Sequence, residues 1–144
     1  RLPPQVRRSM MGGGLEPPAG EKERYERSFQ AMVRMVGEVY RAGIPIVAGT
    51  DTLAGFGLHR ELELYVEAGI PPAEVLGLAT LGSAKIAGRA ERLGTIEVGR
   101  LADLILVDGD PLTDISDIRN VVLTVKDGTI YHPAEMYQAI GVTP

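Results

Sequence analysis

Apolar residues recur at helical spacing in three long stretches of the chain. The first runs from about Glu21 to Ala42, and its apolar stripe consists of Phe29, Met32, Val33, Val36 and Tyr40. A second helix is expected from about Leu58 to Ala68. A third opens at Pro71-Pro72, where proline is tolerated in a first helical turn, and stops near Gly88. A short helix around 134–140 is predicted to finish the chain.

Strand-like patterns occupy other parts of the sequence. The run Ile44–Gly49 is apolar without alternation and ends at glycine, which is typical of a strand buried on both faces of a parallel sheet. After Gly88 the sequence predicts strands at 101–107, 121–125 and 129–131. Asp127-Gly128 between the last two is a strong hairpin signal. Residues 1–20, rich in proline and glycine, and a stretch from Leu53 to Gly57 are predicted to be loops.

A parallel strand that is buried on both faces needs parallel neighbours, and the sequence offers none near Ile44–Gly49. The chain has 144 residues, a length typical of one domain, and its first residue is Arg1. We therefore expect the last part of something larger, either a processed chain or one part of a split enzyme.

Composition excludes several classes of function. Fifteen Lys and Arg against nineteen Asp and Glu give a net charge of −4, and no basic patch is dense enough for nucleic acid. The chain has no cysteine, so disulfides, thiolate nucleophiles and iron–sulfur clusters are excluded. No apolar run reaches membrane-spanning length and the first residues lack a signal-peptide core. We expect a cytoplasmic protein, with an upstream signal peptide left open.

Asp51 and His59 are the candidate functional residues. Asp51 follows the predicted buried strand, at the edge where parallel α/β folds gather catalytic groups, so it can bind a metal or accept a proton. The ordinary alternative is a turn or a helix N-cap. His59 can face the same pocket, or simply bond a neighbouring loop. The only other histidine, His132, is taken as a surface residue, so this chain alone cannot complete a multi-histidine metal site.

A group of aspartates in the strand region is assigned to turns and caps. Its members are Asp108, Asp110, Asp114 and Asp117, and they lack the glycine and glutamate positions of an EF-hand loop. The sequence also contains no dinucleotide fingerprint, phosphate-binding loop or nucleophile elbow. Nucleophilic and phosphoryl-transfer chemistry is therefore disfavoured.

Several motifs in a fixed order resemble the C-terminal part of the metal-dependent amidohydrolases. They are Ile46-Val-Ala-Gly-Thr-Asp-Thr52, the stretch His59–Gly69, Pro72–Thr80, Leu93–Pro111 and Val125–Tyr131. The resemblance covers about residues 40–131 and is nearest to imidazolonepropionase-like and prolidase-like members.

The resemblance implies an α/β fold, namely the C-terminal portion of a (β/α)8 TIM barrel followed by the C-terminal strands of a small β-sandwich. Residues 1–88 would be the last part of the barrel, with Ile44–Gly49 as its eighth strand. Residues 89–133 would be the C-terminal share of the sandwich, and residues 134–144 a helical tail.

The resemblance also implies a role for Asp51 as metal ligand and proton shuttle, and a substrate-side role for His59. The family's other ligands, two histidines from the first strand, a bridging lysine and later histidines, are absent from this chain. The complete protein would hydrolyse an amide, cyclic amide or dipeptide C–N bond through a hydroxide activated by one or two divalent ions, most simply zinc. This chain alone would be inactive.

The implied partners are the missing N-terminal barrel segment or its chain, a small amide or peptide substrate, and further copies in a homo-oligomer. Nucleic acid and membrane are not among them. Two alternatives stay open at this point. One is a non-catalytic structural or pseudoenzyme segment that docks on a partner chain, and the other is a freestanding small-molecule binding domain. In isolation, the apolar helix faces predict self-association or poor solubility.

Overall fold

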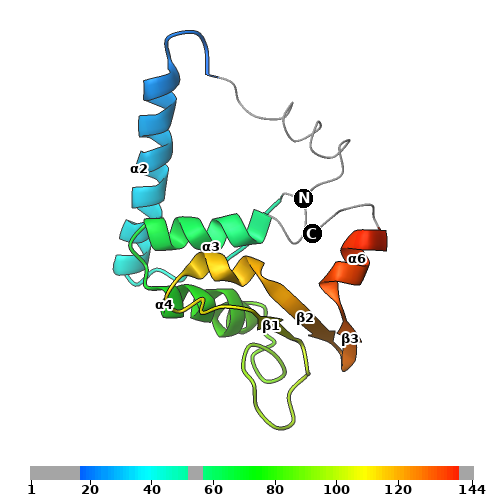
Figure 1. The fold of residues 1–144 in the computed structure, drawn as a ribbon. Coiled ribbons are helices and arrows are strands. Elements are labelled where there is room, and N and C mark those ends of the chain that lie inside the picture. The colour runs from blue at the N-terminus through cyan, green and yellow to red at the C-terminus, as the bar shows by residue number, and fades with distance from the viewer. Residues whose placement is uncertain (1–16, 52–56, 140–144) are drawn as a thin grey trace.

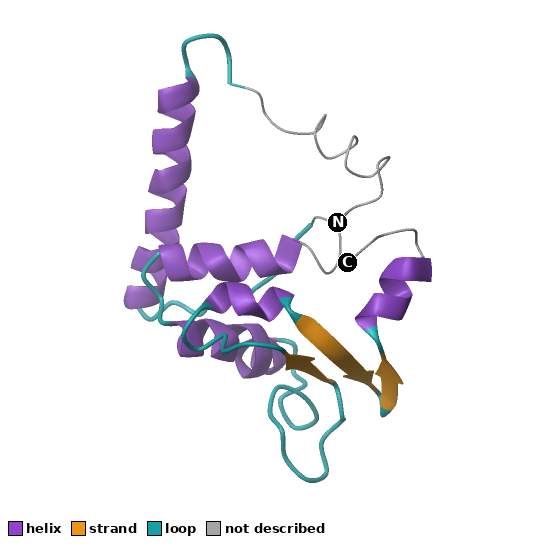
Figure 2. Cartoon of the chain, viewed as in Figure 1, coloured by secondary structure: helices purple, strands orange, loops and turns teal. Residues whose placement is uncertain are grey.

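A computed structural model describes residues 17–51 and 57–139. Helices make up its first part, and a small antiparallel sheet with a final helix makes up the rest (Figures 1 and 2). The loop predictions for residues 1–16 and 53–56, and the end of the chain from residue 140, lie outside the described residues.

Helix α2 (Lys22–Arg41) stands away from the rest of the molecule along most of its length (Figure 1). Only Val33 and Gly37 of this helix are buried, and both lie in its second half. The predicted helix is confirmed, but its apolar stripe is only partly covered, because Phe29 and Met32 are 39% and 55% exposed. The N-terminal half of α2 therefore has no covering element among the described residues.

Helices α2 and α3 (Gly57–Glu67) cross closely at Gly37. A Cβ atom on Gly37 would lie 2.2 Å from the carbonyl oxygen of Ala68, so only glycine permits this approach. After α3, the chain turns through Gly69, whose φ of 90° lies in the left-handed region that glycine adopts readily. Ile70 follows and is almost fully buried.

The third predicted helix is confirmed, although it is not regular. It consists of α4 (Pro72–Gly77), a π-helical turn η1 (Leu78–Gly82) and α5 (Ser83–Ile86). Within it, the Ser83 hydroxyl donates to the carbonyl of Leu78, five residues earlier, which fits the wider π-helical turn.

The sheet has the strand order β1-β2-β3 and is antiparallel throughout. Its strands are β1 (Leu104–Val107), β2 (Val121–Lys126) and β3 (Thr129–Tyr131). Asp127 and Gly128 both have positive φ, as a two-residue hairpin turn requires, so the predicted hairpin is confirmed. Helix α6 (Pro133–Ala139) follows β3. His132, just before it, is exposed, as expected.

A 3-10 helix, η2 (Ile115–Arg119), was not predicted from the sequence. It contributes Ile115 and Ile118 to the main core, whose other buried members are Leu62, Tyr65, Ile70 and Val75. The core is thus shared between helices α3 and α4 and the segment that leads into β2. The aspartates around η2 are used in turns, as predicted: Asp114 accepts from the N–H of Ser116, and Asp117 from the N–H of Asp110.

The prediction of a strand at Ile44–Gly49 is wrong for this structure. Residues 44–50 carry no regular secondary structure. A parallel strand exists only through hydrogen bonds to its neighbours, and the described residues provide no parallel strand beside it. The structure gives no test of the predicted domain boundaries. Along the described residues, no helix has the length and apolar character needed to cross a membrane.

Candidate functional site

The segment that leads to Asp51 is covered on one side only. Ile46 and Ala48 are half-buried and pack against the core, whereas Val47 and Gly49, which alternate with them, are exposed. This alternation is the period of extended chain, in which successive side chains point to opposite faces. Asp51 has the parity of the exposed residues and is itself exposed.

Two side chains of α3 hold the backbone of this segment. The N–H of Gly49 donates to Oε1 of Glu61 at 3.0 Å. The Tyr65 hydroxyl lies 2.8 Å from the carbonyl oxygen of Val47 and 2.8 Å from the same Oε1 of Glu61. The hydroxyl has one proton, which it can donate to either acceptor. Glu61 and Tyr65 are one helical turn apart, so both reach the segment from one face of α3.

Tyr65 is a hydrogen-bond donor throughout the ordinary pH range. Burial raises the pKa of its phenol, and the neighbouring Glu61 carboxylate raises it further. The ring is part of the core and the residue is 8% exposed. The core thus fixes the hydroxyl that contacts Val47.

His59 lies near the start of α3 and is half-buried. Burial lowers the pKa of its imidazole; the positive charge of Arg119 also lowers it, and the Glu63 carboxylate opposes them. The ring is therefore neutral at neutral pH. Among the described residues, no hydrogen bond or ion pair joins His59 to Asp51. Residues 52–56, which lie between Asp51 and α3 in the sequence, are outside the described residues.

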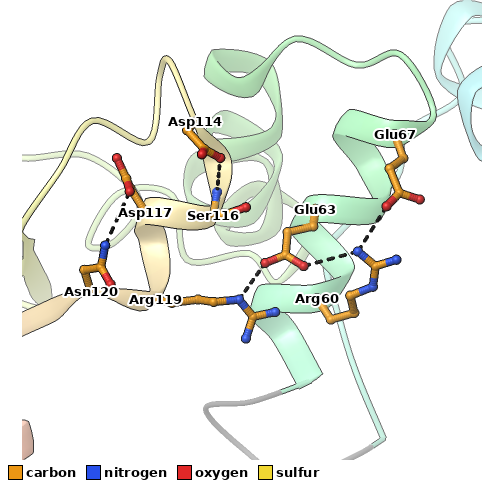
Figure 3. Close-up of polar contacts among 8 residues, drawn as sticks. All are labelled: Arg60, Glu63, Glu67, Asp114, Ser116, Asp117, Arg119 and Asn120. Carbon is orange, nitrogen blue, oxygen red and sulfur yellow. Dashed lines mark hydrogen bonds and ion pairs between the residues drawn. The ribbon is translucent and has the colours of Figure 1, made fainter. Parts of the chain in front are cut away.

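A polar network ties α3 to η2 (Figure 3), and two of its members, Arg119 and Glu63, act on the pKa of His59. Arg119 of η2 donates to Glu63 at 2.6 Å, and Arg60 lies 3.2 Å from Glu63 and 3.1 Å from Glu67. The hydrogen bond from Arg119 is the main reason that the pKa of Glu63 is lowered. The network fixes the charged surroundings of His59.

Asp51 is the predicted metal ligand, and its side chain is exposed. Among the described residues, no group of three or more His, Cys, Asp or Glu side chains gathers to hold an ion. Catalytic zinc takes about three protein ligands. The described residues therefore offer an exposed carboxylate as one ligand position and do not complete a zinc site by themselves.

Comparison with known proteins identifies the family. The model of the amidohydrolase family matches residues 22–131, which include α2, the segment before Asp51, α3 and all three strands. This chain belongs to the amidohydrolase family. The resemblance seen in the sequence motifs is thereby confirmed.

Two curated relatives illustrate how little of a whole enzyme the chain covers. It is 35% identical over 75 residues to the imidazolonepropionase of Caldanaerobacter subterraneus subsp. tengcongensis, a match of 49% of this chain and 18% of the relative. It is 37% identical over 86 residues to the 5-methylthioadenosine/S-adenosylhomocysteine deaminase of Syntrophobacter fumaroxidans, covering 51% of this chain and 19% of that enzyme. The matched part thus spans about a fifth of these relatives.

Solved structures of the same family have a similar fold. A Xaa-Pro dipeptidase with bound methionine in its active site aligns with a TM-score of 0.66 and 36% identity, over 69% of this chain and 25% of that one. A prolidase described from Bifidobacterium longum aligns with a TM-score of 0.64 and 36% identity, over 69% and 26%. These likenesses support an α/β amidohydrolase fold for the aligned part.

Sequence reasoning predicted Asp51 and His59 as site residues but did not predict the side chains that hold the segment before Asp51. Glu61 contacts the backbone 12 residues away, and Tyr65 contacts it 18 residues away. The one available signal was the spacing of Glu61 and Tyr65 at i,i+4 beside an apolar face. That spacing identifies neighbours on a helix without saying what they face.

Proposed function

We propose that the complete protein containing this chain is a metal-dependent hydrolase of amide, cyclic amide or dipeptide C–N bonds. The observation that carries the proposal is the exposed carboxylate of Asp51 at the end of a segment held by α3, in a chain of the amidohydrolase family. The names of the relatives, among them a deaminase, a dipeptidase and a phenylurea hydrolase, support chemistry at bonds to nitrogen. They do not agree on one substrate, so the proposal stays at the level of the bond.

In this proposal Asp51 has two roles. Its carboxylate supplies one ligand to a divalent ion, most simply zinc and one or two in number, whose other ligands come from outside this chain. A bound ion of this kind supplies Lewis-acid activation of water and of the substrate carbonyl. Asp51 accepts the proton of the attacking water and passes it to the leaving nitrogen. The residue is exposed, as both roles require.

His59 is proposed to act on the substrate side. A neutral imidazole, as burial and Arg119 favour here, can accept a hydrogen bond or donate one to a polar substrate group without adding charge. We place it as a binding group, because no described contact joins it to Asp51.

The proposed architecture follows the family. Residues 1–88 complete a (β/α)8 barrel whose upstream strands, with the remaining metal ligands, lie in a segment or chain absent here, of roughly 250 residues by the usual barrel size. Residues 89–133 complete a β-sandwich, and residues 134–144 form a tail. In this arrangement Ile44–Gly49 becomes the eighth strand, and the assembled enzyme is a homo-oligomer.

The complete protein provides the test. The protein is stripped of metal, reloaded with Zn²⁺, and assayed for release of amine or free amino acid on a panel of dipeptides, cyclic amides and simple amides. We expect turnover on one class, its loss on metal removal and its return with Zn²⁺. Turnover that survives complete metal removal, or a complete protein that binds no divalent ion, would contradict the proposal.

A non-catalytic docking segment is the second candidate, and the uncovered half of α2 favours it. Phe29, Met32 and Met35 on that helix are 39%, 55% and 60% exposed. Under this alternative, the assembled protein needs no metal, and Asp51→Asn changes neither binding nor any activity of the assembly. Metal content measured by native mass spectrometry of the assembly separates the two candidates.

A further inference from the structure

His59 shares one face of α3 with Glu63. The two residues are four apart, so their side chains lie one helical turn from each other. Helical side chains lean toward the start of their helix, so the Glu63 carboxylate leans toward the turn that carries His59. His59 is half-buried, and the Glu63 side chain is only 14% exposed. The carboxylate is therefore a near and poorly solvated neighbour of the imidazole.

Two arginines bind the Glu63 carboxylate. Arg119 of η2 donates to its Oε1 at 2.6 Å, and Arg60 of α3 donates to its Oε2 at 3.2 Å (Figure 3). The two contacts differ in origin, because Arg60 belongs to the same helix as Glu63, whereas Arg119 lies 56 residues further along the chain. Of the two, the contact with Arg119 is the one that depends on how η2 packs against α3.

Arg119 and Glu63 act on His59 in opposite directions. Burial is the largest cause that lowers the pKa of His59; the charge of Arg119 lowers that pKa further, and the charge of Glu63 raises it. Helices α2 and α4 also pack on α3, but among the described residues no charged side chain of either helix acts on His59. The electrostatic balance at the ring therefore lies within one ion pair.

We propose that Arg119 is a positioning residue for His59, acting by engaging the Glu63 carboxylate one turn away from the imidazole. The inference rests on the proposed substrate-side role of His59 and adds what fixes the state of that side chain. Without Arg119, Glu63 keeps only its contact with Arg60, and its Oε1 becomes available for a charge-assisted bond to a protonated imidazole. The bond between Arg119 and Glu63 thus preserves the neutral ring that the proposed role uses.

The packing of η2 on α3 fixes the place of Arg119. Ile115 and Ile118 of η2 share the core with Leu62, the residue before Glu63. Arg119 follows Ile118 directly, so the core anchors the backbone from which its guanidinium reaches α3. In the proposed architecture α3 belongs to the barrel part and η2 to the sandwich part. The sandwich part therefore contributes a positioning side chain to a site whose proposed residues lie in the barrel part.

The test uses the complete protein loaded with Zn²⁺, with ¹³C in its histidine rings, so that NMR follows the protonation of each ring against pH. The variants are Arg119→Met, Arg119→Lys and Glu63→Gln, and His59→Gln assigns the His59 resonance. The matched control is Arg60→Met, which removes the other arginine from the same carboxylate. His132, which is exposed, is an internal control and should titrate alike in every variant.

We expect Arg119→Met to raise the pKa of His59, because a positive charge is lost and Glu63 is released toward the ring. Glu63→Gln should lower that pKa, because the opposing negative charge is lost. Arg119→Lys should restore most of the original titration, and Arg60→Met should leave it unchanged. The opposite signs exclude a simple loosening of η2 from α3, because exposure of the ring to water would raise its pKa in both variants.

The same variants are assayed on the dipeptide, cyclic amide or simple amide that the complete protein hydrolyses. At a pH equal to the raised pKa of His59 in Arg119→Met, half of the rings are charged. If the neutral ring is the form that binds substrate, KM at that pH should be about twice its plateau at higher pH, with kcat unchanged. Arg60→Met should show the pH dependence of the original protein.

The remaining outcomes overturn different claims. If the titration of His59 is the same in Arg119→Met as in the original protein, or if its pKa rises in both Arg119→Met and Glu63→Gln, the positioning role of Arg119 is wrong. It is also wrong if the pKa moves as expected while KM keeps its original pH dependence. If the complete protein shows no metal-dependent turnover on any of the three substrate classes, the proposed function itself fails.

Discussion

Asp51 differs from most carboxylates of the strand region in what it contacts. Asp103, Asp110 and Asp117 each accept hydrogen bonds that stabilise a turn. Asp51 is exposed, and its side chain makes no hydrogen bond or ion pair with any other described residue. A carboxylate with no structural task can be replaced at little cost in stability, so a loss of activity on replacement is a specific signal.

Asp51→Asn in the complete protein should lower kcat at least about a hundredfold, because an amide can neither take up a proton nor bind a cation as a carboxylate does. The melting temperature should stay within about 2 °C, as for an exposed polar substitution. Asp108→Asn, another exposed aspartate, is the control and should retain full activity. Equal kcat in the two variants would argue against a catalytic role for Asp51.

Gly94 and Gly99 are two positions at which the free-energy cost of adding a side chain can be compared. Both have positive φ, 95° and 92°, but a Cβ on Gly94 would lie 2.7 Å from the Cα of Leu81 and 3.0 Å from the Cβ of Ala84. A Cβ on Gly99 meets nothing within 4 Å. Backbone strain is thus common to both sites and the clash is confined to Gly94.

Gly99→Ala should lower the free energy of unfolding by about 1 kcal/mol through strain alone. Gly94→Ala should lose about 1–3 kcal/mol more, because the loop must move off the π-helical turn. Urea unfolding of the two variants measures the difference. Equal losses would show that the 94 loop does not pack on η1 as closely as described.

At the scale of elements, the sequence predicted the helices and the hairpin that a local pattern of residues determines. Helices α2 and α3 and the β2–β3 hairpin follow from helical spacing and from Asp127-Gly128, and all are present. The segment 44–49 is different, since its apolar run encodes burial but the strand itself depends on partners elsewhere. Without those partners, the segment keeps only the alternation of an extended chain, in which Ile46 and Ala48 pack against the core.

The 3-10 helix η2 escaped prediction for another reason. Asp, Gly and Pro around it give a strong turn signal, and the two core residues Ile115 and Ile118 are spaced three apart within it, too short a pattern to read as a helix. Asp51 was predicted as a site residue from its place after an apolar run. The contacts of Glu61 with Gly49 and of Tyr65 with Val47 could not be predicted, since contacts across 12 and 18 residues leave no local periodicity.

Gly37 tests the crossing of α2 and α3. Gly37→Ala places a methyl group 2.2 Å from the Ala68 carbonyl oxygen, so the helices must separate, and we expect a loss of about 1–3 kcal/mol in the free energy of unfolding. Gly77→Ala in α4 is the control, because a Cβ there meets nothing within 4 Å. That variant should be neutral or more stable by up to about 1 kcal/mol, since alanine favours helix. If Gly37→Ala leaves the free energy of unfolding unchanged, the two helices do not pack as closely at Gly37 as described.

The ion pair between Glu63 and Arg119 should couple α3 to η2 in a pH-dependent way. The pKa of Glu63 is lowered from its usual 4.5, and the hydrogen bond from Arg119 is the largest cause. The stabilisation is therefore complete above the unfolded pKa and is lost as pH falls through the lower, folded pKa. A double-mutant cycle of Glu63→Gln and Arg119→Met should give about 0.5–1 kcal/mol at pH 7 and a smaller value once the pH is acidic enough to protonate Glu63 in the folded state.

The control cycle for that coupling uses Lys22 and Glu26, whose side chains are 81% and 63% exposed at a separation of 3.8 Å. Exposed pairs of this kind contribute close to nothing. A coupling at Glu63–Arg119 that equals the control, or that grows as pH falls, would show that the polar network does not join the two elements.

At the scale of the whole molecule, apolar surface remains uncovered on two sides. On α2 it comprises Tyr25, Phe29, Met32 and Met35, and on the sheet Ile105, Leu106, Val122 and Ile130 are also exposed. The exposed residues of α2 recur at helical spacing along one stripe, and such a surface usually marks an interface. On the sheet, Ile105 and Leu106 lie on opposite faces, so both faces of the sheet carry exposed apolar residues. The proposed barrel segment and sandwich strands are the partners we assign to these two sides.

The isolated chain should self-associate through α2. Light scattering across a concentration series should show mass rising with concentration, and Met32→Lys with Met35→Lys should reduce it. Glu23→Gln with Glu26→Gln is the control, since it changes net charge by the same two units on exposed positions of the same helix without removing apolar surface. A chain that stays monomeric at every concentration would count against an α2 interface.

The turn at Asp127-Gly128 has a consequence for the order of folding. Lys126 lies opposite Thr129, so the pairing of β2 with β3 requires only a two-residue loop to close, whereas the connection from β1 to β2 is longer and contains η2. A hairpin of this kind forms in about 1–10 μs, far sooner than contacts that wait for distant chain. When the chain refolds, the β2–β3 hairpin should therefore form before contacts between distant segments, such as those of α3 with η2.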